Sequence, residues 1–271
     1  MLVPFHPLGS KAPFYFIHGI AGVMPLGRFL AQSLGPDQPI YAINANNIDQ
    51  REITVKDMAN TYVEEILNTK PRGSIFIGGM CVGGLAALEV ARELEKRGQK
   101  VGPVIIADPP AVPQGLVPHN QTVDPQNPLV AAQLNEQVRG QLLEFSSLPY
   151  NEMPFRHDDE QQVRLATSVG VKALVAFCRY VPEVFTGAAV PILSSRRAAK
   201  FFHPQMPWAK ILPQKCAAFV LPYDHTDLFQ TGRHDFARVL QFVLGEGVTF
   251  RSAVDTVVAP QRGKEFIHEL D

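Results

Sequence analysis

Short apolar runs alternate along this chain with longer stretches in which apolar residues recur every three or four positions. A short run bounded by turn residues predicts a buried strand, and the longer recurrence predicts a helix packed against a sheet. The expected strands are residues 14–18, 39–43, 75–77, 101–107, 190–193 and 217–221, and the expected helices are 26–34, 54–70, 82–97 and 234–244. This order predicts an α/β fold with a mostly parallel sheet flanked by helices.

The alternation of strands and helices is interrupted in the middle of the chain. A Pro- and Asn-rich stretch is followed there by two amphipathic helical patterns, at about 129–145 and 158–180. We interpret this segment as a helical lid inserted into the sheet domain, since lids of this kind close over substrates. The division is a core of 1–110 and 188–244, a lid of 111–187, and a C-terminal tail, 245–271, without clear periodicity.

The sequence G-M-C-V-G at residues 79–83 joins an expected strand to an expected helix. Its pattern, G-x-C-x-G, matches the nucleophile elbow of α/β-hydrolases, with Cys81 where serine is usual. The glycines let strand and helix pass closely around a strained turn. Unpaired N–H groups at the start of the helix would stabilise a thiolate and an acyl oxyanion. The alternative interpretation is a buried structural cysteine in a glycine-rich turn.

Two further residues follow buried strands at the same expected edge of the sheet. Asp108 comes directly after the strand that follows the elbow helix, and His225 comes just after the last core strand. The order Cys81, Asp108, His225 is the nucleophile–acid–histidine order of α/β-hydrolases. Taken alone, Asp108 is also a common turn residue before proline. Asp224 and Asp227 are alternative acids, although both are better placed to cap the following helix.

The segment 194–200 also follows a strand, and some hydrolases place the triad acid there. It contains no acidic residue, which leaves Asp108 as the better candidate. Its basic residues could meet a substrate phosphate, but a solvated basic turn is the simpler interpretation; they are Arg196, Arg197 and Lys200. The single tryptophan, Trp208, is expected to pack under the lid or the edge of the core.

The glycine-rich loop after the first expected strand is the second half of an expected oxyanion hole. The backbone N–H of Ile20 or Ala21 would pair with that of Val82 to bind an acyl oxyanion. His18 lies at the entrance of this loop. We interpret it as a loop histidine that hydrogen-bonds the backbone, because a second catalytic histidine is unnecessary.

The overall composition narrows the possible partners. The formal net charge is −1 and no run of five basic residues occurs, so neither nucleic acid nor an anionic membrane surface is expected as a partner. No apolar run reaches the roughly 18 residues of a membrane span. Residues 1–12 read as a lead-in rather than a signal peptide. Three widely spaced cysteines fit the reducing cytoplasm and show no metal-type spacing, so no bound metal or cofactor is expected.

With these features together, residues 2–244 resemble the thioesterase domains that end nonribosomal peptide and polyketide assembly lines, and their free-standing relatives. The resemblance rests on residues 13–19, 39–41 and 79–84, on Asp108, and on His225 with its neighbour Asp224. It implies an acyl or peptidyl chain delivered on the phosphopantetheine arm of a carrier protein and released by hydrolysis, cyclisation or transfer. Cys81 departs from the family, most of which uses serine. Acyl transfer from a thioester to Cys81 exchanges thioester for thioester and is nearly isoenergetic.

Several functions remain open at this point. The first is a carrier-protein thioesterase, and the second is a Cys-dependent acyl- or aminoacyltransferase acting on an amine or a second carrier protein. An inactive hydrolase-fold binding protein is a third, against which the complete set of Cys81, Asp108 and His225 argues. Dienelactone-hydrolase-like chemistry also uses a cysteine elbow, but the lid fits the thioesterase pattern better. The identity of the small-molecule acyl substrate is open, as is the choice between a free-standing protein and an excised domain.

Overall fold

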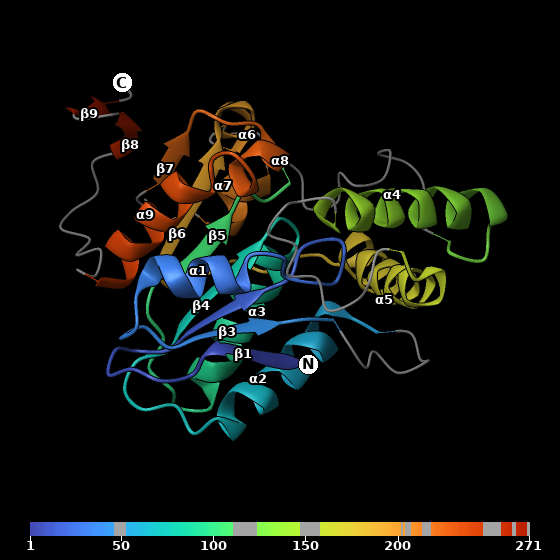
Figure 1. Ribbon diagram of the computed structural model, residues 1–271, viewed down its shortest axis with the longest axis horizontal. Coiled ribbons are helices and arrows are strands. Elements are labelled where there is room, and N and C mark those ends of the chain that lie inside the picture. Colours follow the sequence, from blue (N-terminus) through green and yellow to red (C-terminus); the bar gives the residue numbers. More distant parts are fainter. Residues whose placement is uncertain are drawn as a thin grey trace.

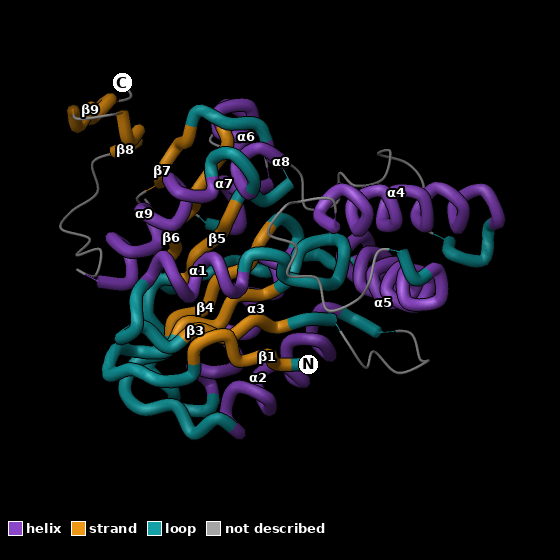
Figure 2. The backbone as a smooth tube through the Cα atoms, viewed as in Figure 1, coloured by secondary structure: helices purple, strands orange, loops and turns teal. Residues whose placement is uncertain are grey.

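The computed structural model describes residues 1–45, 53–110, 124–146, 158–201, 203, 207–212, 218–245, 256–261 and 264–269. Its described strands form one sheet in the order β1-β3-β2-β4-β5-β6-β7-β8-β9 (Figures 1 and 2). The strands are β1 (Leu2–His6), β2 (Phe14–Ile17), β3 (Ile40–Ile43), β4 (Phe76–Met80), β5 (Val104–Ala107), β6 (Ala189–Ser194), β7 (Ala218–Leu221), β8 (Thr256–Gln261) and β9 (Lys264–Glu269). Neighbours from β3 to β8 are parallel, and only the outer pairs β1·β3 and β8·β9 are antiparallel. The expected mostly parallel sheet is confirmed.

Helices cover both faces of this sheet. They are α1 (Gly27–Leu34), α2 (Val55–Asn68), α3 (Gly83–Lys96), α4 (Pro128–Ser146), α5 (Glu160–Arg179), α6 (Ser195–Phe201), α7 (Pro207–Ile211), α8 (His225–Phe229) and α9 (Arg233–Gly245). Alternate residues of β2 contact opposite layers, as the pleat requires. Phe16 packs on Phe236 of α9, and the Tyr15 hydroxyl bonds to Thr69 at the end of α2. β2 and β5 are therefore apolar and buried along their whole length.

Local signals in the sequence account for where several elements begin and end. Thr54 and Asp57 form a capping box at the start of α2: Thr54 Oγ1 accepts the Asp57 N–H at 3.1 Å, and Asp57 Oδ2 accepts the Thr54 N–H at 3.0 Å. The expected strand 101–107 is shorter in the structure. Val101 makes only an isolated bridge to Ile75, and β5 begins after Pro103, which has no N–H for the ladder.

Strands also lie in two segments for which the sequence predicted no element. The lead-in contains the edge strand β1, and the tail contains β8 and β9. Proline interrupts the apolar pattern of two of these strands, at Pro4 in the edge strand β1 and at Pro260 in β8. The basic segment expected as a solvated turn is the helix α6. Trp208 is buried in α7 as expected, and its indole N–H donates to the Pro110 carbonyl.

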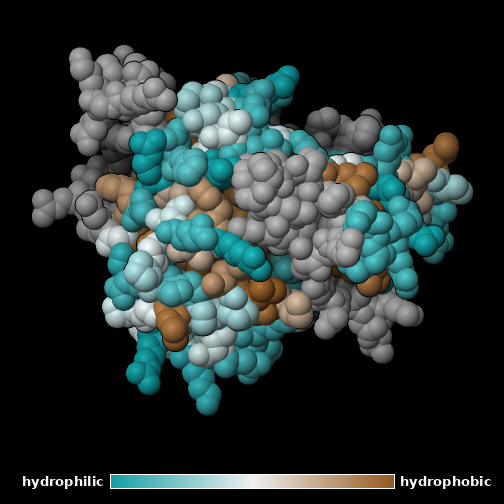
Figure 3. All heavy atoms as spheres, viewed as in Figure 1, coloured by the Kyte–Doolittle hydropathy of each residue, from teal (hydrophilic) through white to brown (hydrophobic). Residues whose placement is uncertain are grey.

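The two helices expected in the middle of the chain are present as α4 and α5, which lie side by side at the right of Figure 1. The Pro- and Asn-rich segment before them lies outside the described residues. Their buried apolar positions include Leu134, Leu142 and Leu174. Large apolar side chains are also exposed on this helix pair, at Leu129, Leu143 and Leu165, and Figure 3 shows brown patches among hydrophilic residues over it.

Candidate functional site

Cys81 lies at the apex of a tight turn between β4 and α3. Its φ of 54° is left-handed, a conformation that residues other than glycine rarely adopt. Hydrogen bonds hold the turn, from the Cys81 N–H to the Ala107 carbonyl at 2.8 Å and from the Gly84 N–H to the Cys81 carbonyl at 3.1 Å. Backbone strain in a turn held this firmly is typical of functional sites.

Two glycines of the G-x-C-x-G pattern are required by close backbone packing. A Cβ atom at Gly79 would lie 2.0 Å from the Gly83 carbonyl oxygen, and one at Gly83 would lie 2.1 Å from the His18 carbonyl oxygen. Neither position can hold a larger residue unless the backbone moves. The elbow, the start of α3 and the end of β2 are therefore fixed against each other, as the pattern predicts for a strand–turn–helix nucleophile site.

Asp108 lies at the end of β5, fully buried, and it also has a left-handed φ, 45°. Its Oδ1 accepts the Ser194 backbone N–H at 2.7 Å, and its Oδ2 accepts the His225 Nδ1–H at 2.6 Å. Both carboxylate oxygens therefore have partners, which compensates for removing the charge from water. The hydrogen bond between Asp108 and His225 fixes the orientation of the imidazole. It leaves the other ring nitrogen available for proton transfer.

His225 is the first residue of α8, and its ring packs edge-on against Phe229, 5.6 Å between ring centroids. Its imidazole hydrogen-bonds to Asp108 and lies close enough to Cys81 to lower the pKa of that thiol. The structure thus brings together the three residues that the sequence separates by as many as 144 positions, 225 minus 81. The neighbouring Asp224 is exposed at the N-cap of α8, but the expectation that its side chain caps the helix is wrong. Asp227 is exposed too.

The pKa values of Cys81 and His225 favour a thiolate–imidazolium ion pair. Burial alone raises the pKa of the Cys81 thiol, but the charge and hydrogen bond of His225, the charge of Arg197 and the Val82 N–H together lower it to about 7. Burial alone lowers the pKa of His225, but the charge of Cys81 and the Asp108 hydrogen bond raise it to about 9. Between these values the pair is thiolate and imidazolium, because Cys81 has lost its proton and His225 has kept one.

We expect alkylation of Cys81 by iodoacetamide to increase with pH through a midpoint near 7, because the thiolate is the reactive form. An unperturbed thiol has its midpoint at about 8.5. Site-resolved peptide mass spectrometry would follow Cys81 and Cys178 in the same sample, and burial raises the pKa of Cys178 to about 11, which makes it an internal control. In His225→Gln the Cys81 midpoint should move upward. A wild-type midpoint at 8.5 or above would contradict the ion pair.

The segments that carry the expected oxyanion donors lie beside the Cys81 turn. Val82 stands directly before α3, and its backbone N–H contributes to the lowered pKa of the Cys81 thiol. The loop of residues 19–24 lies against the elbow, since a Cβ at Gly19 would be 3.5 Å from the Cβ of Cys81. Within the described part of the chain, neither the Ile20 N–H nor the Ala21 N–H donates to another residue.

His18 is fully buried beneath this loop. Its Nδ1–H donates to the Gly19 carbonyl at 2.6 Å, and its Nε2 accepts from the Tyr62 hydroxyl at 2.8 Å. Burial lowers the pKa of His18 to about 4, so the ring is neutral. The interpretation of His18 as a histidine that hydrogen-bonds the backbone is confirmed. No pattern in the sequence predicts that Tyr62 completes this contact.

Arg197 is a site residue that the sequence interpretation missed. It belongs to α6, and its guanidinium donates to the Asp108 carbonyl oxygen and places Nε 3.5 Å from Asp108 Oδ2. The basic segment was interpreted as solvated, although its position immediately after β6 is the signal that could have placed it at this edge of the sheet. Arg196 and Lys200 of the same segment are exposed.

In the part of the chain that the structure describes, no three His, Cys, Asp or Glu side chains are grouped so that they could hold a metal ion. Of the helices described, none is long and apolar enough to cross a membrane.

Known proteins resemble this chain in sequence and in fold. The profile of the family described as "Thioesterase domain" matches residues 13–160, more than half of the chain. The chain belongs to the thioesterase domain family and has the α/β-hydrolase fold, which confirms the expected fold class. Among curated proteins, it is 30% identical over 134 residues to a dimodular nonribosomal peptide synthase of Bacillus subtilis and 31% identical over 124 residues to malpinin synthetase of Mortierella alpina. These matches cover 48% and 45% of the chain but only 6% and 2% of the two synthetases.

Solved structures match more of the chain. The NocB thioesterase domain in covalent complex with a fluorophosphonate nocardicin G analogue has a TM-score of 0.67 at 20% identity, over 90% of this chain and 99% of that one. The type II thioesterase BorB from the borrelidin cluster has a TM-score of 0.64 at 15% identity, over 90% and 97%. At these low sequence identities, the structural similarity establishes the fold alone.

Proposed function

We propose that Cys81 is the nucleophile of a thioesterase that accepts an acyl or peptidyl chain from a phosphopantetheine thioester. The observation that carries this proposal is the chain of contacts from Asp108 through His225 to Cys81 at a nucleophile elbow. It sits in a chain of the thioesterase domain family, which supports thioester cleavage as the reaction. In this proposal Asp108 holds the histidine and Val82, with Ile20 or Ala21, supplies the oxyanion donors.

The proposed acylation step begins from the thiolate–imidazolium pair. The Cys81 sulfur attacks the thioester carbonyl carbon, and the carbonyl oxygen becomes an oxyanion held by backbone N–H groups. The bond from carbon to the pantetheine sulfur then breaks, and His225 gives its proton to that leaving thiolate. The products are an acyl–Cys81 thioester, a free pantetheine thiol and a neutral imidazole.

The proposed release step reverses the proton transfers. Neutral His225 takes a proton from water or from a hydroxyl or amine of the acyl chain, and the new nucleophile attacks the acyl carbon. Breaking the carbon–sulfur bond restores the Cys81 thiolate and the imidazolium. Water gives a carboxylic acid, and an internal nucleophile gives a ring.

A second candidate function is that of an acyl- or aminoacyltransferase, and the cysteine at position 81 supports it. A cysteine keeps the acyl group as a thioester, so the acyl–enzyme stays reactive toward an external amine or a second carrier thiol. The same residues perform both reactions, and only the final acceptor differs.

The proposed partner is an acyl or peptidyl carrier protein with its phosphopantetheine arm, and the proposed compartment is the cytoplasm. The partner is supported by the synthetases that the chain matches, of which it spans a few per cent. The reducing compartment is supported by the free thiols of Cys81 and Cys178. The small-molecule acyl group is of unassigned structure.

Intact-protein mass spectrometry after mixing with hexanoyl-pantetheine would test the proposal. We expect an added hexanoyl mass that maps to Cys81 and that accumulates in His225→Ala, because release needs the imidazole as base. Decay of the adduct in buffer alone indicates hydrolysis, whereas decay only with an added amine or carrier thiol indicates transfer. Absence of an adduct from hexanoyl- and aminoacyl-pantetheine alike would overturn covalent catalysis.

A further inference from the structure

Helix α5 packs directly against the loop that carries two of the proposed oxyanion donors. The contact is made at Gly170, a buried glycine inside the helix. A Cβ at Gly170 would lie 3.1 Å from the Ala21 carbonyl oxygen and 2.6 Å from Val138 Cγ1 of α4. A Cβ at Gly22, which has a left-handed φ of 74°, would lie 3.4 Å from the Gly170 Cα. The backbones of helix and loop are thus in contact, and a side chain at position 170 would separate them.

The same face of α5 touches the loop a second time, seven residues further along. The Phe177 ring meets His18 edge-on at 6.4 Å between centroids. Positions seven apart lie on one face of a helix. His18 in turn bonds to the Gly19 carbonyl and to Tyr62 of α2. The loop is therefore held between α5 on one side and the core on the other.

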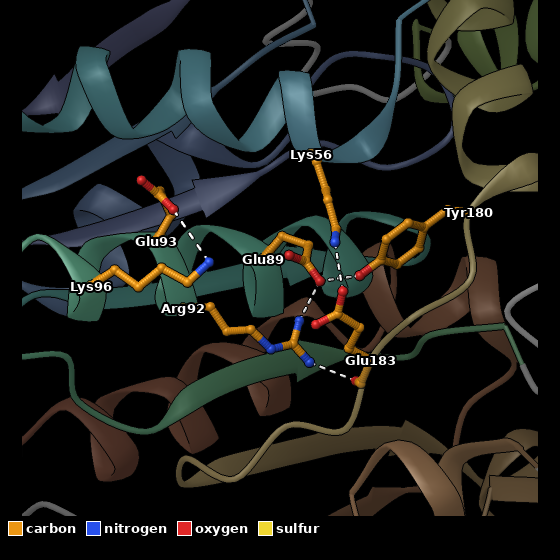
Figure 4. A network of polar contacts seen from close by, with 7 residues as sticks. All are labelled: Lys56, Glu89, Arg92, Glu93, Lys96, Tyr180 and Glu183. Carbon is orange, nitrogen blue, oxygen red and sulfur yellow. Dashed lines mark hydrogen bonds and ion pairs between the residues drawn. The ribbon is translucent and has the colours of Figure 1, made fainter.

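The end of α5 is fastened to the elbow helix by the polar network of Figure 4. Tyr180, the C-cap of α5, donates its hydroxyl to the buried Glu89 carboxylate of α3, which also accepts from Arg92. Arg92 donates to the Glu183 carbonyl at 2.6 Å, and Lys56 of α2 pairs with the Glu183 carboxylate at 2.6 Å. α3 begins at the elbow, so this network ties α5 to the helix that carries Cys81 at its start.

We propose that Gly170 is a positioning residue for the reaction. Its lack of a side chain lets α5 lie against Ala21 and Gly22, and this contact sets where the N–H groups of Ile20 and Ala21 lie relative to Cys81. Because the Figure 4 network prevents α5 from shifting at its end, a side chain at position 170 displaces the loop rather than the whole helix. The inference rests on the proposed function, since it assigns the loop to an oxyanion hole.

The test compares Gly170→Ala with Gly140→Ala, a matched control on the neighbouring helix α4. A Cβ at Gly140 meets no atom within 4 Å, whereas one at Gly170 meets backbone and side chain. We expect kcat for hexanoyl-pantetheine, per titrated Cys81, to fall by about tenfold to a hundredfold in Gly170→Ala, with KM little changed. An oxyanion donor acts mainly in the transition state, and its complete loss costs roughly 100- to 1,000-fold. Gly140→Ala should stay within twofold of wild type.

Two further measurements separate this role from a general loss of structure. The Cys81 alkylation rate depends on its pairing with His225 and should be unchanged in Gly170→Ala. If that variant fails to fold, Gly170→Ala with Val138→Ala removes the tighter clash, keeps the contact to Ala21, and should show the same loss of kcat. A kcat within twofold of wild type in the folded variant would overturn the proposal. Failure of the proposed function itself would appear differently, as a wild-type enzyme that forms no acyl–Cys81.

Discussion

Replacing Cys81 by alanine should lower the turnover of hexanoyl-pantetheine on the order of 10⁴-fold or more. Removing the nucleophile of a triad leaves only the oxyanion hole and substrate binding to accelerate attack by water. The elbow itself should survive, because it is held by the backbone bonds of Cys81 and by the close packing of Gly79 and Gly83. Release of free pantetheine thiol, followed with a chromogenic disulfide, measures the loss.

Cys178→Ala is the control for this substitution. Cys178 is a free thiol on α5 that is only partly buried, and burial raises its pKa to about 11. The turnover of hexanoyl-pantetheine by Cys178→Ala should stay within twofold of wild type, since a protonated thiol is a poor nucleophile. Equal losses in the two variants would point to thiol chemistry unrelated to the elbow. A fully active Cys81→Ala enzyme would remove cysteine from the mechanism.

Replacing Asp108 by asparagine should lower kcat/KM by about 10³- to 10⁴-fold at pH 7, the scale found when a triad acid is made neutral. The carboxylate accepts two N–H groups, one from Ser194 and one from His225. An asparagine side chain has one acceptor oxygen, so its NH₂ group must face one of these donors. If the NH₂ group faces His225, Nδ1 of the imidazole must accept a hydrogen bond from it. The proton of the neutral ring then sits on the other nitrogen, which cannot accept a proton from Cys81.

The same substitution should reduce the reactivity of Cys81 toward iodoacetamide at pH 7. Asp108 helps to raise the pKa of His225 to about 9, and the imidazolium in turn lowers the pKa of Cys81. Without the carboxylate, His225 loses its proton at lower pH and the thiol keeps its proton to higher pH. The alkylation midpoint should therefore move upward from about 7 in Asp108→Asn.

Asp224→Asn is the matched control for the acid. Asp224 precedes His225 in the chain but is exposed at the N-cap of α8. Its substitution should change kcat/KM by less than twofold. The opposite result, an active Asp108→Asn enzyme and an impaired Asp224→Asn enzyme, would identify Asp224 as the acid of the triad. Circular dichroism of both variants would show whether the fold is retained.

Much of the site depends on local sequence and was therefore predictable. The glycines at 79 and 83 and the apolar residues around them require a strand, a tight turn and a helix, with Cys81 at the turn. The strand order likewise places residues 108 and 225 at the ends of β5 and β7. Parallel strands present these ends at one edge of the sheet, so their meeting follows from the topology. Strands β1, β8 and β9 escaped prediction because they contain little apolar periodicity.

Other features were decided only by the tertiary structure. The sequence favours Asp108 over Asp224 as the acid, but only the structure shows the buried Asp108 bonded to His225 and Asp224 exposed. Arg197 resembles any basic surface residue until α6 places it against Asp108. Gly170 resembles any glycine in an amphipathic helix until α5 lies against Ala21. The sequence alone determined the elements and the nucleophile turn, because these depend on neighbouring residues, whereas contacts between distant segments depend on how the helices pack across the sheet.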